Sequence, residues 1–473
     1  MNNIVKIKNL YFISWNNCYG ILLCLFLIPG FTSCKKYLEL EPEEDMALPS
    51  TLKDCQALLD NYSIMNTNYP IGDQYADDYY LTFDNWKNQY EINRDGYIWK
   101  SDGDTPSEMW MLAYQKVLYA NEVLETLEKI VPAAGEQATW NRLKGAALFL
   151  RSLSFYMTAQ IWAKPYDATT ASTDPGIPLR LSSDISETSV RGTVAQTYDR
   201  ILIDLNDAVT LLRDTLPISV VTKSRPGQAA AHALLARVLL SMSNYNEALI
   251  HADKCLQRYN TLIDFNTLNY NNVDVLLLVR YNKEVIFHAS SYATIVLDPT
   301  ISKVDSNLHR SYETNDLRRI FFFGQFTGSP NYSYGFFGSY NGGRVTSILF
   351  CGLATDEMYL IRAECYARAG NTGNALADLN TLLKTRWKKP FTDITATSAG
   401  DALAKIVTER RKELLYRGLR WPDLRRLNKE PAFAVDLMRQ LDVTYTLPAN
   451  DLRYTLLLPQ EVVKREPMVQ NPR

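Results

Sequence analysis

The chain has 473 residues, of which 46% are apolar and 22% are charged, and its formal net charge is −2. This length is sufficient for a sizeable core and suggests about two or three domains' worth of chain. The near-balance of charge argues against a nucleic-acid-binding protein, which usually carries a basic excess. Tyrosine is abundant, with 29 residues against 17 phenylalanines. Its apolar ring and polar tip suit either half-buried helix packing or a wet binding surface.

The start of the chain has the pattern of an exported protein. Lys6 and Lys8 precede an apolar run that begins at Ile21, and small residues then lead to Cys34. This order predicts a signal peptide over residues 1–33, because an apolar run of about 8–11 residues is too short to span a bilayer. The segment resembles a bacterial lipoprotein signal, which implies that Cys34 is acylated, as by palmitate. A plain secretory signal with an incidental Cys34 is the alternative.

The remaining cysteines and the histidines show no metal-ligand spacing. None of the seven cysteines forms a C-x-x-C pair, so zinc and thioredoxin-type sites have no basis in the sequence. Cys255 and Cys365 fall within helical patterns, where a free cysteine is usually a small buried apolar residue. His232 and His251 also lie on predicted helices, without H-E-x-x-H spacing, and are expected to be satisfied inside the fold. We expect no metal site and no cofactor.

Two long segments predict helices. Residues Asn141–Trp162 carry apolar side chains at helical spacing without an internal breaker. A second helix is expected from Thr193, as its N-cap, to Asp214, before Pro217.

A repeat follows these helices. Residues Ala233–Leu249 align with Leu360–Leu376 at an offset of 127, which places Asn244 on Asn371. Each copy predicts a helix, a short turn of Asn or Gly type, and a second helix with small residues for close packing. This pattern is typical of tetratricopeptide-like hairpins, which stack to bury a shared face.

Two segments break the helical pattern, residues 69–110 and about 298–352, and both interleave aromatic residues with Gly, Asn and Asp. Long loops in a compact domain are usually functional or disordered, and this aromatic content argues against disorder. Sugars present flat apolar faces ringed by hydroxyls, so a binding site needs aromatic platforms with polar neighbours. The candidates are Asp77, Asp78, Trp86, Tyr97, Trp99, Tyr292, Tyr312, Tyr334, Tyr340, Asn341 and Arg344. Core packing or contact with a partner protein is the alternative for each of them.

Two segments near the end of the chain carry recognisable motifs, Ile406–Leu427, "IVTERRKELLYRGLRWPDLRRL", and Leu456–Arg473. They resemble the helix E-R-R-x-E-L-x-x-E-G-x-R-W-x-D-L-x-R and the closing segment of the SusD/RagB-like family of Bacteroidetes outer-membrane lipoproteins. The start at Cys34, Tyr37-Leu38 and Pro42, and the helix-to-proline segment Gly145–Tyr166, match two further landmarks. The chain departs from the pattern at Arg417, where the family usually has Glu, and at Leu457 and Glu466.

The resemblance implies an all-α fold with four tetratricopeptide-like hairpins and a loop-rich, less regular half that binds ligand. Residues 34–230 and 231–473 would be its N-terminal and C-terminal regions within one compact unit. It also implies a non-enzymatic lipoprotein that faces the cell exterior, held to the outer membrane only by its lipid. Its partner would be a TonB-dependent transporter of the SusC type, and its cargo oligosaccharides or, alternatively, peptides.

Other interpretations of the charged residues are weaker. The arginine-rich segment 406–427 could contact phosphates, but Glu409, Glu413 and Asp423 are spaced for i,i+3 and i,i+4 pairing with its arginines. We therefore expect a structural network of ion pairs around Trp421.

Two carboxylate motifs are likewise weak evidence, one for a calcium site and the other for an enzyme active site. Asp102, Asp104 and Glu108 have a partial calcium-loop spacing, and a solvated turn is the favoured interpretation. The pair Asp77-Asp78 leaves a secreted glycoside hydrolase as a remote alternative.

Overall fold

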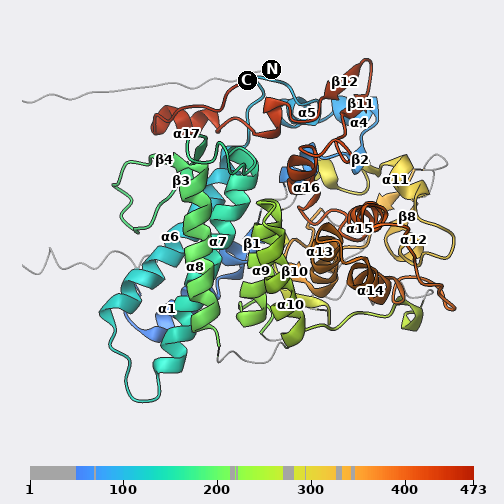
Figure 1. Ribbon diagram of the computed structural model, residues 1–473. Coiled ribbons are helices and arrows are strands. Elements are labelled where there is room, and N and C mark those ends of the chain that lie inside the picture. Colours follow the sequence, from blue (N-terminus) through green and yellow to red (C-terminus); the bar gives the residue numbers. More distant parts are fainter. Residues whose placement is uncertain are drawn as a thin grey trace, which may run out of the picture. The chain divides into compact units, whose positions relative to one another are not determined.

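The computed structural model describes residues 49–68, 71–213, 219, 222–269, 282–292, 294–325, 333–341 and 347–473 (Figure 1). In the first half of the chain the helices are α1 (Leu52–Leu59), α2 (Tyr62–Met65), α3 (Ile71–Tyr75), α4 (Phe83–Lys87), α5 (Glu91–Tyr97), α6 (Ser107–Lys129), α7 (Gln137–Trp162) and α8 (Val194–Leu211). In the second half they are α9 (Gln228–Ser241), α10 (Tyr245–Arg258), α11 (Ser306–Arg310), α12 (Arg318–Phe321), α13 (Thr355–Arg368), α14 (Thr372–Leu383), α15 (Ala399–Glu413), α16 (Arg420–Leu427) and α17 (Gln460–Arg465). The fold is all-α in class, as expected.

The described strands are short and pair only in twos. They are β1 (Thr67–Asn68), β2 (Tyr79–Tyr80), β3 (Pro175–Pro178), β4 (Arg191–Thr193), β5 (Val285–Phe287), β6 (Ser290–Ser291), β7 (Lys303–Val304), β8 (Phe323–Gly324), β9 (Gly335–Phe336), β10 (Leu353–Ala354), β11 (Leu437–Gln440) and β12 (Thr444–Leu447). The pairs are β1–β6 (parallel) and the antiparallel β2–β7, β3–β4, β5–β10, β8–β9 and β11–β12.

Helix α7 lies between α6 and α8, and this position explains its composition (Figure 1). It is apolar on nearly all sides, and most of its residues from Leu143 to Trp162 are buried, as is usual for a helix enclosed by its neighbours. This confirms the helix predicted over Asn141–Trp162. Helix α8 begins where expected, with Thr193 and Gln196 forming a capping box. It ends at Leu211, and the predicted end at Asp214 lies outside the described residues.

The predicted repeat is confirmed as two helical hairpins, α9–α10 and α13–α14, which also pack on one another (Figure 1). Asn244 and Asn371 cap the second helix of each hairpin, and each side chain accepts a hydrogen bond from the backbone N–H three residues on. The residue before each cap is left-handed, Ser243 with φ 60° and Gly370 with φ 78°. The turn therefore has the same geometry in both copies, although only one uses the glycine that this conformation favours.

The cysteines and histidines of the hairpins are buried, as expected. Cys255 and Cys365 are free and almost completely buried, and burial raises the pKa of the Cys365 thiol to about 12. His232 and His251 face each other across α9 and α10, with 3.0 Å between their Nδ1 atoms. Burial lowers their pKa values to about 3 and about 4. Both rings are thus neutral, and the Nδ1–H of one ring donates a hydrogen bond to Nδ1 of the other.

Helix α3 holds a buried carboxyl group that forms no ion pair with any residue in the described part of the chain. Asp73 is 3% exposed, and one of its oxygens accepts a hydrogen bond from the N–H of Gly418 at 2.6 Å. Gly418 has φ 75°, so a glycine suits the turn that aims this N–H at the carboxyl group. Burial raises the pKa of Asp73 to about 8, because the charged form loses its hydration.

This shift predicts a pH dependence of stability. Between about pH 4, the unfolded pKa, and about pH 8, the folded chain binds more protons at Asp73 than the unfolded chain, so stability falls as pH rises. Asn cannot titrate, and Asp73→Asn should therefore reduce the loss of unfolding free energy between pH 5 and pH 8 by about 2 kcal/mol. Urea unfolding at both pH values measures this loss. If the free energy of unfolding changed equally with pH in the variant and the wild type, the raised pKa of Asp73 would be contradicted.

No helix in the described part of the chain is both long enough and apolar enough to cross a membrane.

Candidate ligand-binding surface

The two aromatic segments predicted from the sequence come together in the structure. Strand β2 of the first segment pairs with β7 of the second, with Tyr79 opposite Val304. The Asp305 N–H also donates to the Asp78 carbonyl oxygen, at 2.8 Å. Residues more than 200 positions apart in the sequence thus form one region, and it contains the buried aromatic cluster around Phe321.

Asp77 and Asp78, the candidate carboxylates, are held by arginines of the C-terminal motif. Arg420 binds both oxygens of Asp77, at 2.7 and 2.9 Å, and Arg411 Nε lies 2.8 Å from Asp78. Burial raises the pKa of Asp77, but Arg420 and Arg411 outweigh it and hold that pKa below its usual value. Burial raises the pKa of Asp78. Both side chains therefore join the first segment to α15 and α16.

Tyr97 and Trp99, two candidate platforms, instead surround an internal arginine. Arg439, from β11, lies 4.3 Å from the Tyr97 ring, 5.1 Å from the Trp99 ring and 4.7 Å from the Tyr79 ring. Its guanidinium also donates to the carbonyls of Ala76 and Tyr79. Tyr97 is 2% and Trp99 3% exposed, so their ring faces are occupied by this arginine and by the core.

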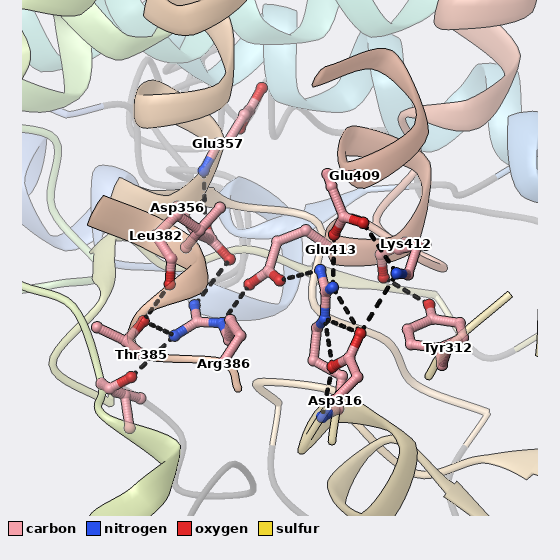
Figure 2. Close-up of polar contacts among 12 residues, drawn as sticks. Tyr312, Asp316, Asp356, Glu357, Leu382, Thr385, Arg386, Glu409, Lys412 and Glu413 are labelled. Atoms are coloured by element: carbon pink, nitrogen blue, oxygen red, sulfur yellow. Dashed lines mark hydrogen bonds and ion pairs between the residues drawn. The ribbon is translucent and has the colours of Figure 1, made fainter. Parts of the chain in front are cut away.

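Tyr312 and Tyr340 are also buried beside a network of charged side chains, and Figure 2 shows Tyr312 at the edge of this network. The Tyr312 hydroxyl donates to the Lys412 carbonyl at 2.7 Å, and the Arg318 guanidinium lies over its ring at 5.5 Å. The Tyr340 hydroxyl donates to Glu284 at 2.5 Å. Tyr97, Trp99, Tyr312 and Tyr340 thus each contact a buried cation. Core packing, the alternative to ligand binding given above, accounts for the positions of all four side chains in this structure.

The charged network itself is centred on Glu413, which lies 3.0 Å from Arg318 and 2.7 Å from Arg386 (Figure 2). Its carboxylates are Glu284, Asp316, Asp356, Glu409 and Glu413, and its cations are Arg318, Arg386, Lys412 and Arg417. Burial and neighbouring carboxylates raise the pKa of Asp356 to about 7, although Arg417 opposes this. The protonation of Asp356 offsets the excess of carboxylates.

The network corrects one prediction about the arginine-rich segment. Ion pairs are present around Trp421 as expected, but most partners are distant in sequence and are not i,i+3 or i,i+4 neighbours. Arg410 pairs with Asp423 at 2.8 Å, and Arg425 contacts only backbone carbonyls of the α7 end. The sequence motif is divided between two helices, because α15 ends before α16 begins. Its charged side chains therefore pair between helices, and not between successive turns of one helix.

At Arg417 the sequence departs from the family motif, and this side chain forms an ion pair with a buried acid. It lies 2.7 Å from Asp356 and stacks on the Tyr340 ring at 4.2 Å. The replacement of an acid by a base at this position is therefore accommodated inside the network.

Two candidates, Trp86 and Tyr334, are partly buried and pack against the aromatic cluster around Phe321. Trp86 packs on the aromatic cluster, and its Nε1 donates to the Arg94 carbonyl at 3.1 Å. Tyr334 stacks on the His309 ring at 3.7 Å, and its carbonyl accepts from the N–H of Val304 at 2.8 Å. The hydrogen bonds and stacking fix both rings in orientation.

Three residues that sequence reasoning missed complete this area. Phe83 is 40% exposed, with its ring 5.8 Å from that of Trp86. Tyr80 is half-buried on β2, and the Asn85 amide donates to the carbonyl of Ile301, in the second segment, at 2.8 Å. The i,i+3 spacing of Phe83 and Trp86, after Thr82 as N-cap, was a signal for an aromatic pair on a short helix. We name Tyr80, Phe83, Asn85, Trp86 and Tyr334 the aromatic surface.

The remaining candidates are Tyr292, which precedes the second segment, and Asn341 and Arg344, which lie within it. Tyr292 is 54% exposed, next to β6. Asn341 is half-buried, and its amide donates to the Ile348 carbonyl at 3.3 Å. Arg344 lies outside the described residues.

The partial calcium-loop motif forms a capped turn. Asp104 accepts hydrogen bonds from the N–H groups of Thr105, at 2.8 Å, and Gln460, at 3.0 Å. Within the described ranges, no group of three or more His, Cys, Asp or Glu side chains gathers in an arrangement that could hold a metal ion.

Comparisons with known proteins identify the family. The family described as "Starch-binding associating with outer membrane" matches residues 36–240, and the one described as "SusD family" matches residues 355–471. A search of curated proteins found no match.

Solved structures with the same fold include three SusD-like proteins. A SusD superfamily protein from Bacteroides thetaiotaomicron is 20% identical with a TM-score of 0.70, covering 89% of this chain and 100% of its own. A SusD-like carbohydrate binding protein from Bacteroides vulgatus is 20% identical with a TM-score of 0.68, covering 88% and 97%. A laminarin binding SusD-like protein is 16% identical with a TM-score of 0.64, covering 90% and 100%. The two family matches cover both ends of the fold in the order that the motifs predict, and the chain belongs to the SusD/RagB-like family.

Proposed function

We propose that the protein binds oligosaccharides at the cell surface and passes them to a TonB-dependent outer-membrane transporter. The observation that carries this proposal is the aromatic surface, on which the exposed Phe83 ring lies beside the partly exposed side chains of Trp86 and Asn85, and to which Tyr334 adds a third partly exposed ring. Rings with fixed orientation and nearby amides are suited to the apolar faces and hydroxyls of sugars. Capture and release break no covalent bond, so the proposed role is not enzymatic.

The relatives support carbohydrate as the cargo. One of the solved structures is described as a carbohydrate binding protein and another as laminarin binding. The carboxylates Asp77 and Asp78 are engaged by Arg411 and Arg420, which leaves them poorly placed for the acid–base work of a hydrolase. Tyr292 and Asn341 would extend the aromatic surface toward longer ligands.

Replacing Trp86 by Ala should weaken oligosaccharide binding about tenfold or more, because an aromatic anchor usually carries much of the binding energy of such a site. Affinity electrophoresis in gels containing soluble polysaccharides, followed by calorimetry with the oligosaccharide that retards the protein, measures the change.

Trp140 supplies a matched control. It is also half-buried, and its Nε1 donates to a backbone carbonyl, that of Leu127, at 3.0 Å. It lies on α7, which contributes no residue to the aromatic surface. Trp140→Ala should bind as the wild type does, and equal losses in both variants would refute a specific role for Trp86.

We infer that the protein is anchored through Cys34, which lies outside the described residues. Three features support this: the signal-like segment before Cys34, the acidic residues Glu39–Asp45 that follow it, and a family described as associating with the outer membrane. Cys34→Ala should move most of the protein from the membrane fraction to the soluble fraction, because acyl chains supply about 0.8 kcal/mol per buried methylene. Fractionation with immunoblotting measures this, and a variant that stays in the membrane fraction would refute the anchor.

A further inference from the structure

A cavity of about 240 Å³ lies away from the aromatic surface and shares no residue with it. Three segments line it: residues 164–174 after α7, the end of α16 with residues 428–429, and residues 450–455, which include the 3-10 turn Leu452–Tyr454. The lining is dominated by polar and charged side chains. The volume is of the order of a single sugar ring or a few water molecules.

Arg425 is a buried cation in the wall of this cavity. It is 3% exposed and donates to the carbonyls of Ala159, Gln160 and Ala163, at the C-terminal end of α7. This end of a helix carries a partial negative charge that favours a cation. Among the described residues, no carboxylate forms an ion pair with Arg425, and burial lowers its pKa to about 10.

The other charges around the cavity cancel in pairs. Lys164 lies 2.5 Å from Asp174, Lys429 lies 3.2 Å from Asp167, and Asp451 lies 2.8 Å from Arg453. Arg425 is thus the lining cation that has no carboxylate partner among the described residues. A ligand with one negative charge would neutralise it.

Hydrogen-bond donors in the same wall lack acceptors. Nε of Arg425, Nδ2 of Asn428 and the hydroxyl of Tyr454 are buried and make no hydrogen bond of acceptable geometry. Each of the three residues is 3% exposed. Asn428 and Tyr454 lie within hydrogen-bonding reach of each other, so Nε of Arg425 is the donor without such a neighbour among the described residues. Buried donors without partners are costly, so a ligand or water that supplies oxygen acceptors is favoured.

We propose that this cavity binds a small hydroxylated carboxylate of the size of one sugar ring, such as a uronic acid. The carboxylate would neutralise the charge of Arg425, and the ring oxygens would accept from Asn428 and Tyr454. Lys164 and Lys429, at the same wall, would remain paired with their aspartates. The site shares no residue with the aromatic surface, and its test is independent of the function proposed above.

Calorimetry on the full-length protein with D-glucuronate, D-glucose and cyclohexanecarboxylate tests the site. Glucuronate has both the charge and the hydroxyls, glucose lacks the charge, and cyclohexanecarboxylate lacks the hydroxyls. We expect glucuronate to bind about tenfold more tightly than either. Tyr454→Phe keeps the ring and removes a donor, and Asn428→Asp removes a donor and adds a negative charge that repels the carboxylate. Each should weaken glucuronate binding by about tenfold.

Lys405→Met is the matched control, because Lys405 is an exposed lysine paired with Asp401 at 2.9 Å and lies on α15, outside the cavity. Lys429→Met changes a residue at the cavity wall that is partly exposed, and it should weaken binding even if a buried variant fails to fold. Equal binding of glucuronate and glucose, unchanged binding in the cavity variants, or no binding tighter than about 10 mM would each overturn the proposal.

Discussion

Replacing Arg439 by Ala should lower the free energy of unfolding by about 3 kcal/mol or more. The guanidinium lies among the rings of Tyr79, Tyr97 and Trp99, and a desolvated cation–π contact contributes about 2 kcal/mol. Its loss also leaves the Ala76 and Tyr79 carbonyls without their donor and opens a cavity in the aromatic cluster. Urea unfolding monitored by tryptophan fluorescence measures the change.

Two further variants separate these contributions. Arg439→Lys keeps the charge but loses the planar fork that reaches two carbonyls, so we expect an intermediate loss. Arg465→Ala removes an arginine that is 73% exposed and paired with Glu461, and it should change stability by less than about 0.5 kcal/mol. If Arg439→Ala also remained within that range, the rings of the first segment would not depend on this arginine.

Replacing Arg386 by Ala should lower the free energy of unfolding by about 4 kcal/mol at neutral pH. Arg386 is completely buried; it binds Glu413 at 2.7 Å (Figure 2) and Glu284 at 2.9 Å. With Asp356 protonated, the described carboxylates and cations of the network balance, so the variant would leave one carboxylate uncompensated. Removal of one partner from a buried ion pair typically costs about 3–5 kcal/mol, because the remaining charge is uncompensated.

The same variant should have a distinctive pH dependence. Without Arg386, the folded-state pKa of Glu413, which this arginine now helps to hold low against burial, should rise above its unfolded value near 4, and that of Asp356, already raised to about 7, should rise further. Groups with raised pKa values stabilise the folded chain at low pH and lose that contribution as pH rises. Arg386→Ala should therefore recover part of its stability between pH 8 and pH 5, relative to the wild type.

A surface pair provides the control for this prediction. Arg225 binds Asp60 through two nitrogens, at 2.8 and 2.6 Å, but it is 40% exposed. Arg225→Ala should cost at most about 1 kcal/mol and should show no recovery at pH 5. A loss in Arg386→Ala no larger than that of Arg225→Ala would contradict the structural role of the buried network.

Local signals in the sequence were sufficient for the helical scaffold. The spacing of apolar residues predicted α7, Thr193 marked the start of α8, and the offset between Asn244 and Asn371 revealed the hairpins. These features depend on neighbours within a few turns of the chain, which is why they can be read without a structure.

The candidate site depends on contacts that local patterns do not contain. Tyr97 and Trp99 have the same composition signal as Trp86, but only the structure shows that Arg439, more than 300 residues away, occupies their rings. Asp77 likewise meets Arg420 across the fold. Composition could identify a segment rich in aromatic residues, but it could not divide those residues between the core and the surface.

The most direct test of the proposed function is an array of oligosaccharides and an array of peptides, probed in parallel with the purified protein. We expect binding to one class of glycan, loss of that signal in Trp86→Ala, and its retention in Trp140→Ala. Binding to peptides and to no glycan would contradict the assignment of carbohydrate as cargo and would favour peptide uptake by the same architecture.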